Sequence, residues 1–494
     1  MSTAASAVVL RRAPRAAPAR LSVRRLCAIN AFWFGNGAHW QPLFVALVPE
    51  GAKLLVGSDR SDALVGRATA AGGIFALLVP LLAGWLSDRT RSRFGRRRPW
   101  MVAGSALNIV GLLLLGLAWS PVTLIGFYLL VQAGNNIAGA AYSGVIPDAV
   151  PAPQRGTASG LLGTMNQLGT VVGILLIAIV FSVFGRNRSA LLVGYGVVAA
   201  IFLTTLVITC IATRERPLEA APRARLRFAP RATAFGISLA ITVVLLVAAI
   251  GVELGSALGP VAVAACVAAI VTTFIGKGIP GLRQFFAALG DHDFRWVFLT
   301  RMVMQIGIFS IVPFIDSYFE KVVGSTNSGA ASSYWLLAVI AGGIVPAVWG
   351  GRLSDRAGRR KPFVYVAGAL QALAASVILV SLVSSPLALY GIGLVFGVGY
   401  GAYYAIDWAL ACDVLPDREQ GAGRDMAIWH ISFTLPQVIA PTIAAVLLTT
   451  LNNGGHSILG ISSGNNLGFR VVFGSAAIWF TLGTVLVSRV RGVR

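Results

Sequence analysis

The sequence predicts an all-α membrane protein with two parallel-repeated six-helix bundles and two extra central helices, giving 14 transmembrane helices. Three observations lead to this fold class: the composition, a series of long apolar runs, and two motifs that recur at nearly the same offset. Of the 494 residues, 56% are hydrophobic and only 12% are charged. A soluble protein of this length needs more polar surface, so lipid is expected to surround most of the chain.

The apolar runs have the length of membrane-spanning helices, which need about 20 apolar residues. In chain order they are 26–48, 63–86, 100–120, 122–146, 157–184, 190–212, 234–252, 257–276, 296–319, 330–350, 363–384, 386–411, 426–449 and 469–488. The first six and the last six runs are expected to form the two bundles.

The segments between and around these runs complete the predicted domain organisation. It comprises a basic cytosolic tail, an N-terminal bundle, a central loop with two extra transmembrane helices, a C-terminal bundle and a second cytosolic tail, at 1–25, 26–212, 213–295, 296–488 and 489–494.

The net charge of +22 is a topology signal. If the N-terminus is cytoplasmic, 32 of the 40 basic residues fall in segments on the inner side, seven fall outside and Arg301 lies within a span. This asymmetry follows the positive-inside rule. It predicts a multi-pass protein of the cell membrane with both termini in the cytoplasm, and it argues against a nucleic-acid partner.

Two motifs recur along the chain. The first is LSDR at 86–89 and 353–356, each copy followed by Gly, basic residues and Pro. In the second, Asp148, Pro151 and Gly156 match Asp413, Pro416 and Gly421 at a constant offset of 265. Two motifs at nearly one offset indicate a duplicated half with parallel copies. Both copies must face the same side, so the central insert must cross the membrane an even number of times.

The pattern G-x-L-x-D-R…G-R-R between the second and third helix of each half resembles the major facilitator superfamily. The resemblance implies that this loop acts as a cytoplasmic latch. The positions that match are Gly84, Leu86, Asp88, Arg89, Gly95, Arg96 and Arg97, with Gly351, Leu353, Asp355, Arg356, Gly358, Arg359 and Arg360 in the second half.

The chemistry of these residues suits a latch. A carboxylate at a helix end caps a neighbouring helix N-terminus or pairs with arginine, and such contacts can differ between two conformations. Asp148 and Asp413 end spans on the same side, so we expect them to be acidic partners of the latch arginines. The alternative is an arginine cluster that only fixes orientation in the membrane.

A narrower resemblance rests on SDRTRSRFGRRRPW and YSGVIPDAVPAPQRGTASG at 87–100 and 142–160. These stretches are similar to the branch of glycoside–pentoside–hexuronide cation symporters and proton-coupled sucrose carriers, which implies a sugar or glycoside substrate. Melibiose-type members hold the coupling cation with aspartates inside helices 2 and 4. Here 63–86 and 122–146 have no acid in their interiors, so we expect no metal site and favour a proton as the coupling ion.

Two ionisable residues within spans are functional candidates, because such groups are costly in a membrane. Arg301 lies six residues into a span that enters from the cytoplasm, and Asp407 lies six residues before Asp413, where another span leaves on that side. Equal depth predicts an Arg301–Asp407 pair that protonation of Asp407 would release. In the alternative, Arg301 extends to the inner surface and Asp407 is a structural partner of a nearby tyrosine.

Further candidates for substrate or proton contacts are polar and aromatic residues in or near the spans: His39, Asn36, Asn135, Tyr142, Tyr404 and Asp316. Amides and aromatic faces together suit a sugar ring, although helix packing explains most of them equally well. Asp316 lies close to the outer end of its span, where a solvated rim is as good an interpretation as a proton site.

Together these features predict a secondary active transporter that moves a small-molecule substrate by alternating access with a proton. We expect it to work in the lipid bilayer as a monomer, without a cofactor. A fourteen-helix drug:proton antiporter is the alternative, although helix 5 lacks the proline of the G-x-x-x-G-P-x-x-G-G pattern typical of that group. A polytopic membrane transferase is the more distant alternative, and no enzymatic motif supports it.

Overall fold

The computed structural model describes residues 20–213, 215, 286–381, 383–417, 421–453, 457–458, 461–462 and 466–493. The two extra central helices expected at 234–252 and 257–276 lie outside the described residues. Within the described residues, 11 helices are long and apolar enough to cross a membrane. The all-helical fold is as predicted, and the count of fourteen stays a prediction.

The first half of the chain is helical almost throughout. Its elements are α1 (Val23–Pro42), the π-helix η1 (Leu43–Leu47), α2 (Val48–Val56), α3 (Ser58–Arg89), α4 (Arg98–Gly116), α5 (Pro121–Ser143), α6 (Val145–Ala149), the 3-10 turn η2 (Ala152–Gln154), α7 (Arg155–Phe184) and α8 (Arg188–Ala212). Helix α1 is not among the 11 because its polar residues, including Asn30 and His39, make it less apolar.

The second half has a corresponding series of helices and one short hairpin. Its elements are η3 (Phe286–Gly290), α12 (His292–Ile311), η4 (Val312–Phe314), α13 (Ile315–Lys321), α14 (Ser328–Ala357), α15 (Lys361–Ser381), α16 (Pro386–Asp413), α17 (Ala422–Asn453), the strands β1 (Ser457–Ile458) and β2 (Ile461–Ser462), α18 (Leu467–Leu486) and η6 (Val487–Arg489). The strands pair antiparallel.

Local sequence accounts for several helix starts. The Ser120 hydroxyl and Thr123 form a capping box at the start of α5, where Pro121 takes the first helical position. The Asp291 carboxylate accepts the Phe294 N–H at the start of α12, and Ser385 caps α16 in the same way. These caps determine where each helix begins, so the polar turns lie between the apolar helices.

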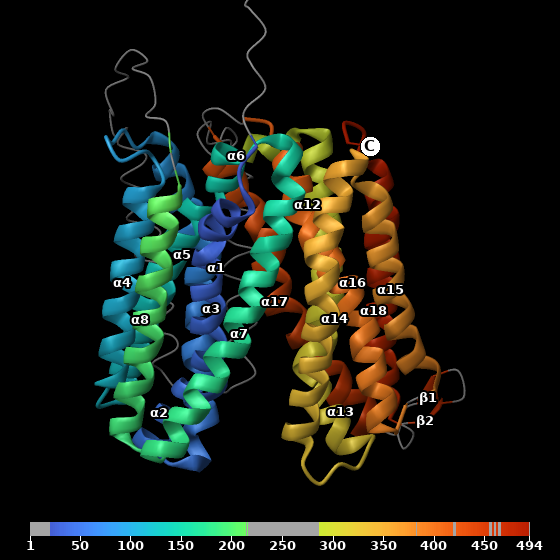
Figure 1. The fold of residues 1–494 in the computed structure, drawn as a ribbon. Coiled ribbons are helices and arrows are strands. Elements are labelled where there is room, and N and C mark those ends of the chain that lie inside the picture. The colour runs from blue at the N-terminus through green and yellow to red at the C-terminus, as the bar shows by residue number, and fades with distance from the viewer. Residues whose placement is uncertain are drawn as a thin grey trace, which may run out of the picture.

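The helices before residue 213 lie on one side of the molecule and those after 286 on the other (Figure 1). Helices of the two sides meet where α7 packs against α14 and α16, and where α17 packs against α3 and α5. Helix α1 begins and α18 ends at the same end of the molecule as α6 (Figure 1), which we call the latch end.

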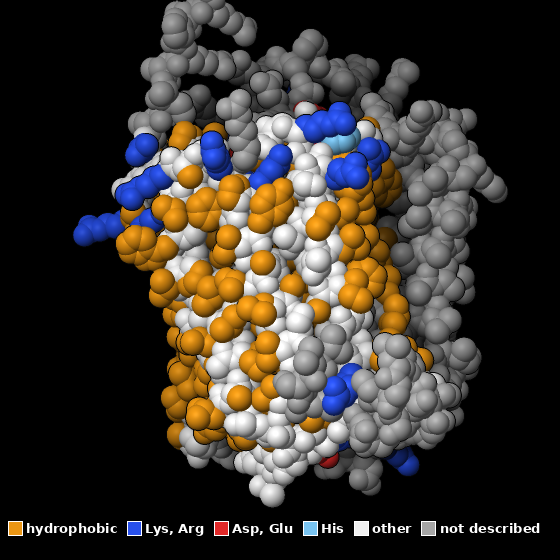
Figure 2. Space-filling view, turned by 90° about the vertical axis from the view of Figure 1, so that its right-hand side faces the viewer, with side chains coloured by type: hydrophobic (Ala, Val, Ile, Leu, Met, Phe, Trp, Pro, Cys, Tyr) orange, Lys and Arg blue, Asp and Glu red, His pale blue; other side chains and the backbone are white. Residues whose placement is uncertain are grey.

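The outer surface is apolar along the middle of the helices. Large hydrophobic side chains near the middle of their helices, such as Leu175, Leu373 and Ile478, are 58%, 57% and 66% exposed. Figure 2 shows hydrophobic side chains over the middle of one face, with most of the visible Lys and Arg side chains near the latch end. Such a surface is expected to face lipid.

Candidate functional site

Asp88 joins the two halves of the molecule at the latch end. It lies in the last turn of α3, and its two carboxylate oxygens accept the N–H groups of Gly423 and Arg424 at 2.9 and 2.7 Å. These N–H groups open α17, so the carboxylate caps a helix from the other half. The Arg97 guanidinium lies 2.7 Å from the same carboxylate.

Asp355 repeats this arrangement in the second half. It lies near the end of α14 and accepts the N–H groups of Gly156 and Thr157 at 2.9 and 2.7 Å, together with the Thr157 hydroxyl at 2.8 Å. Gly156 and Thr157 belong to the first turn of α7. Arg360 pairs with Asp355 at 2.7 Å. Each half therefore caps a helix of the other half with one carboxylate.

Asp148 lies against two latch arginines. Its oxygens are 2.6 Å from Arg96 Nη2 and 3.0 Å from Arg97 Nε. Burial lowers the pKa of the Arg97 guanidinium, but the Asp148 and Asp88 carboxylates outweigh that effect and leave it raised. Arg97 therefore stays charged between its two carboxylates.

Asp413 occupies the equivalent position in the second half. Its oxygens lie 3.2 Å from Arg360 Nε and 3.3 Å from Arg155 Nη1. Arg155 was not among the predicted latch residues. Only its position next to the repeated Gly156 could have indicated a role, since the residue at the matching position in the second half is Gln420.

The latch glycines allow close helix contact or sharp turns. A Cβ at Gly84 would lie 2.5 Å from the carbonyl oxygen of Gly423, so α3 and α17 touch at this point. Gly95 and Gly358 have φ values of 95° and 61°, which favour glycine. Any side chain larger than the hydrogen atom of glycine would push α3 and α17 apart at Gly84.

Three predicted latch arginines are exposed and lie apart from these interhelical contacts: Arg89, Arg356 and Arg359. The Arg89 guanidinium stacks over the Trp85 ring of its own helix at 4.0 Å.

Glu215 is a latch residue that sequence reasoning missed. Its carboxylate accepts the N–H groups of Arg97 and Arg98 at 2.8 and 3.1 Å and so caps the start of α4. The available signal was an acid placed just after a span, at the start of an arginine-rich segment.

Charge reversal at Asp148 tests the latch pairing. We expect Asp148→Arg to reduce transport, because the new guanidinium would face Arg96 and Arg97. Adding Arg96→Asp should restore part of the rate, since one attraction returns while the repulsion from Arg97 remains. Comparing the rates of the single and double variants should give a coupling of about 1 kcal/mol. The control is Arg89→Asp, whose exposed side chain should rescue nothing; equal rescue by both would contradict a specific Arg96–Asp148 pair.

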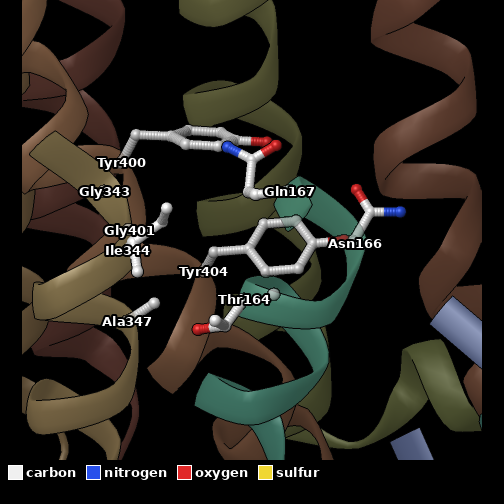
Figure 3. A pocket seen from close by; sticks show the side chains of 10 residues that line it. Thr164, Asn166, Gln167, Gly343, Ile344, Ala347, Tyr400, Gly401 and Tyr404 are labelled. Carbon is white, nitrogen blue, oxygen red and sulfur yellow. The ribbon is translucent and has the colours of Figure 1, made fainter. Parts of the chain in front are cut away.

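A pocket lies between α7, α14 and α16. It is lined by Gly163, Thr164, Asn166, Gln167, Gly343, Ile344, Ala347, Tyr400, Gly401 and Tyr404. Figure 3 shows the Gln167 amide beside the Tyr400 ring, and the Tyr404 ring reaching from α16 toward α7. Of these residues, the sequence identified Tyr404 as a site candidate and missed the polar side chains of α7.

The buried pair Arg301–Asp407 lies next to this pocket. Arg301 Nε is 3.4 Å from Asp407 Oδ2, and both residues are almost fully buried. The Tyr403 hydroxyl donates to the other oxygen of Asp407 at 3.2 Å. Tyr404 and Tyr400 precede Asp407 by three and seven residues, which places them on one stripe of α16. The pair and the pocket are therefore linked along a single helix face, and both charges act on the two tyrosine hydroxyls.

Three other predicted residues lie within the first half and have partners there. The Asn36 amide donates to Asn135 Oδ1 at 3.1 Å, joining α1 to α5. The Tyr142 hydroxyl donates to Asn30 Oδ1 at 2.7 Å. None of the three lines the pocket between α7, α14 and α16.

The two remaining candidates lie away from that pocket as well. His39 is fully buried and its ring contacts the rings of Trp40 and Phe202. Asp316 is exposed and accepts a hydrogen bond from the Ser332 hydroxyl at 3.1 Å. In the part of the chain that the structure describes, no group of three or more His, Cys, Asp or Glu residues could hold a metal ion.

Comparison with known proteins places this geometry in a family. Residues 43–423 match the Major Facilitator Superfamily. A general alpha-glucoside permease of Schizosaccharomyces pombe is 34% identical over 167 residues, which are 30% of this chain and 30% of the permease. The multi-drug resistance efflux pump PmrA of Streptococcus pneumoniae is 25% identical over 433 residues, 83% of this chain and 86% of the pump.

A solved structure supports the same fold. The human organic anion transporter MFSD10 aligns with a TM-score of 0.62 and 16% identity, covering 94% of this chain and 99% of that protein. The chain belongs to the Major Facilitator Superfamily, whose members are transporters and not enzymes.

Proposed function

We propose that this protein is a proton-coupled symporter of a sugar or glycoside that works by alternating access. In this proposal, two six-helix bundles with two extra central helices move against each other in the cell membrane. Both termini and the latch end face the cytoplasm.

The observation that carries the proposal is the buried Arg301–Asp407 pair beside a polar pocket. A carboxylate almost fully buried in a membrane protein is costly unless it is paired or protonated. Asp407 has both options, because Arg301 neutralises its charged form and a proton neutralises it otherwise. A group that exchanges an ion pair for a proton can link proton binding to conformation.

The pocket has the chemistry that a sugar requires. The rings of Tyr400 and Tyr404 offer aromatic faces, and the amide of Gln167 and the hydroxyl of Thr164 offer hydrogen bonds. The similarity to an alpha-glucoside permease over 30% of the chain supports the same substrate class.

The latch supports alternating access. The N-termini of α7 and α17 are each capped by a carboxylate of the opposite half, at the latch end. Opening the protein at this end must break all these contacts together. They therefore stabilise one of two conformations, with the substrate path closed at the latch end.

A fourteen-helix drug:proton antiporter is the second candidate. It is favoured by the similarity to a multidrug efflux pump, which extends over 83% of the chain. The same buried pair would also serve a proton antiporter. The two candidates differ in whether the proton moves in the same direction as the substrate or in the opposite direction.

A ligand screen tests the substrate class. Purified full-length protein is heated with a panel of neutral glycosides and a panel of cationic drugs, and the unfolding temperature is recorded. A bound ligand stabilises the folded state in proportion to the logarithm of its concentration over its Kd. The proposal predicts stabilisation by at least one glycoside and its loss in Gln167→Leu. Stabilisation by drugs alone would replace the symporter with the efflux pump.

A further inference from the structure

Arg301 has a second partner besides Asp407. Its Cζ atom lies 3.5 Å from the centroid of the Trp429 ring and 5.5 Å from that of Phe433. Trp429 is fully buried on α17, while Arg301 is on α12 and Asp407 on α16. The guanidinium is therefore held by one carboxylate and one indole face that come from different helices.

The indole face becomes important when Asp407 is neutral. Once a proton binds the Asp407 carboxylate, the buried Arg301 guanidinium loses its ion-pair partner. Among aromatic rings, tryptophan attracts a cation most strongly, and the attraction grows when the cation is desolvated. Trp429 then becomes the main stabilising contact of Arg301.

Other charged and titratable groups are poorly placed to take over this role. Those nearest the pair are Tyr400, Tyr403 and Tyr404 of α16 and His430 of α17. Apart from Arg301 itself, the described charged side chains of α7, α12, α14, α15 and α18 lie toward the helix ends, as with Arg155, Asp355, Lys361, Asp293, Arg295 and Arg470.

Trp429 also connects the pair to the other half of the molecule. Its ring meets that of Trp408 edge-on, with centroids 5.0 Å apart. Trp408 in turn meets Trp33 of α1 edge-on at 5.7 Å. Trp429 follows Gly423, the residue capped by Asp88, by six positions on the same helix. A shift of the Trp429 ring would therefore act on two contacts between the halves. One is the contact of the Trp408 and Trp33 rings, and the other is the cap that Asp88 places on α17.

We propose that Trp429 is a positioning residue that holds Arg301 when Asp407 takes up a proton, and that Trp408 and Trp33 transmit the change to the contact between the halves. This inference rests on the proposed proton coupling at Asp407. It adds a residue whose action passes through Arg301 and needs no contact with the substrate.

The pH dependence of transport is the first test. Trp429→Leu removes the ring, so protonation of Asp407 leaves Arg301 without a partner and becomes harder. We expect the midpoint of the pH profile for glycoside uptake to fall by about half to one pH unit. The variant would then need a proton concentration about three to ten times higher for the same rate. Trp429→Phe should fall in between. Trp335→Leu is the matched control, because Trp335 is a fully buried tryptophan of α14 away from the pair.

Fluorescence of the purified full-length protein gives a second test that requires no substrate. Subtracting the pH titration of Trp429→Phe from that of the wild type isolates the emission of Trp429. The inference predicts one transition in this difference signal, absent when the subtraction is repeated in the Asp407→Asn background. A flat signal, or a transition unchanged by Asp407→Asn, would overturn it. Equal shifts of the uptake midpoint in Trp429→Leu and Trp335→Leu would overturn it as well.

The two experiments separate the inference from the proposed function. If the fluorescence transition depends on Asp407 but a pH gradient drives no glycoside uptake, the symporter proposal fails while the positioning role stands. If uptake is proton-driven and the difference signal is flat, the role of Trp429 fails alone.

Discussion

Asp407→Asn is expected to abolish accumulation of substrate against a concentration gradient while leaving exchange across the membrane largely intact. Asparagine imitates the protonated carboxyl in shape and charge, but it cannot release a proton, so the pH gradient can no longer drive the cycle. Binding and exchange persist because they need only the neutral form. Proteoliposomes with an inward proton gradient measure accumulation, and preloaded vesicles without a gradient measure exchange.

Asp316→Asn is the matched control for this variant. Asp316 is an exposed aspartate whose carboxylate bonds to Ser332, and its change should leave accumulation close to that of the wild type. Full pH-driven accumulation by Asp407→Asn would exclude Asp407 as the coupling group. Loss of accumulation in Asp316→Asn would indicate that the proton binds at Asp316 instead, near the end of its span.

Gly84→Val is expected to reduce the transport rate by at least about tenfold and to leave the latch end open. A Cβ at this position would lie 2.5 Å from the Gly423 carbonyl oxygen and 2.9 Å from Ala427 Cβ, so valine must push α3 away from α17. The N–H groups of Gly423 and Arg424 then move out of reach of Asp88, and the cap is lost. Cysteine labelling from the latch end should become faster.

Gly66→Val provides the comparison for this change. Gly66 lies on the same helix, and a Cβ there meets no atom within 4 Å. Gly66→Val therefore introduces the same side chain into α3 without touching α17. Similar transport and labelling in both valine variants would show that the close contact at Gly84 is unimportant for closing the latch end.

The sequence was most informative about positions along helices. The run predicted at 157–184 corresponds to α7 at Arg155–Phe184, and the run at 190–212 to α8 at Arg188–Ala212. The length of an apolar run indicates such boundaries because a helix must span the hydrocarbon thickness of the bilayer. The depth of Arg301 and Asp407 was inferred in the same way, and the structure brings the two side chains together at 3.4 Å.

Rotation of a helix about its own axis was harder to predict. Asn36 and Tyr142 were candidate sugar contacts, and the structure shows each in a hydrogen bond within the first half, with Asn135 and Asn30. Their role in sugar binding stays a prediction. The polar residues of α7 that line the pocket were missed because a glycine-rich helix gives no strong periodic signal. Trp429 was missed for a related reason, since a tryptophan in an apolar run looks like a packing residue until its neighbours are known.

Proton movement during glycoside entry tests the central claim most directly. Wild-type protein is reconstituted in lightly buffered liposomes without a pH gradient, a glycoside identified in the ligand screen is added outside, and the external pH is recorded. Symport predicts that the external pH rises as the glycoside enters, and that this rise is absent with Asp407→Asn. A fall in external pH on addition of the substrate, or glycoside entry with no change of pH, would contradict proton symport through the Arg301–Asp407 pair.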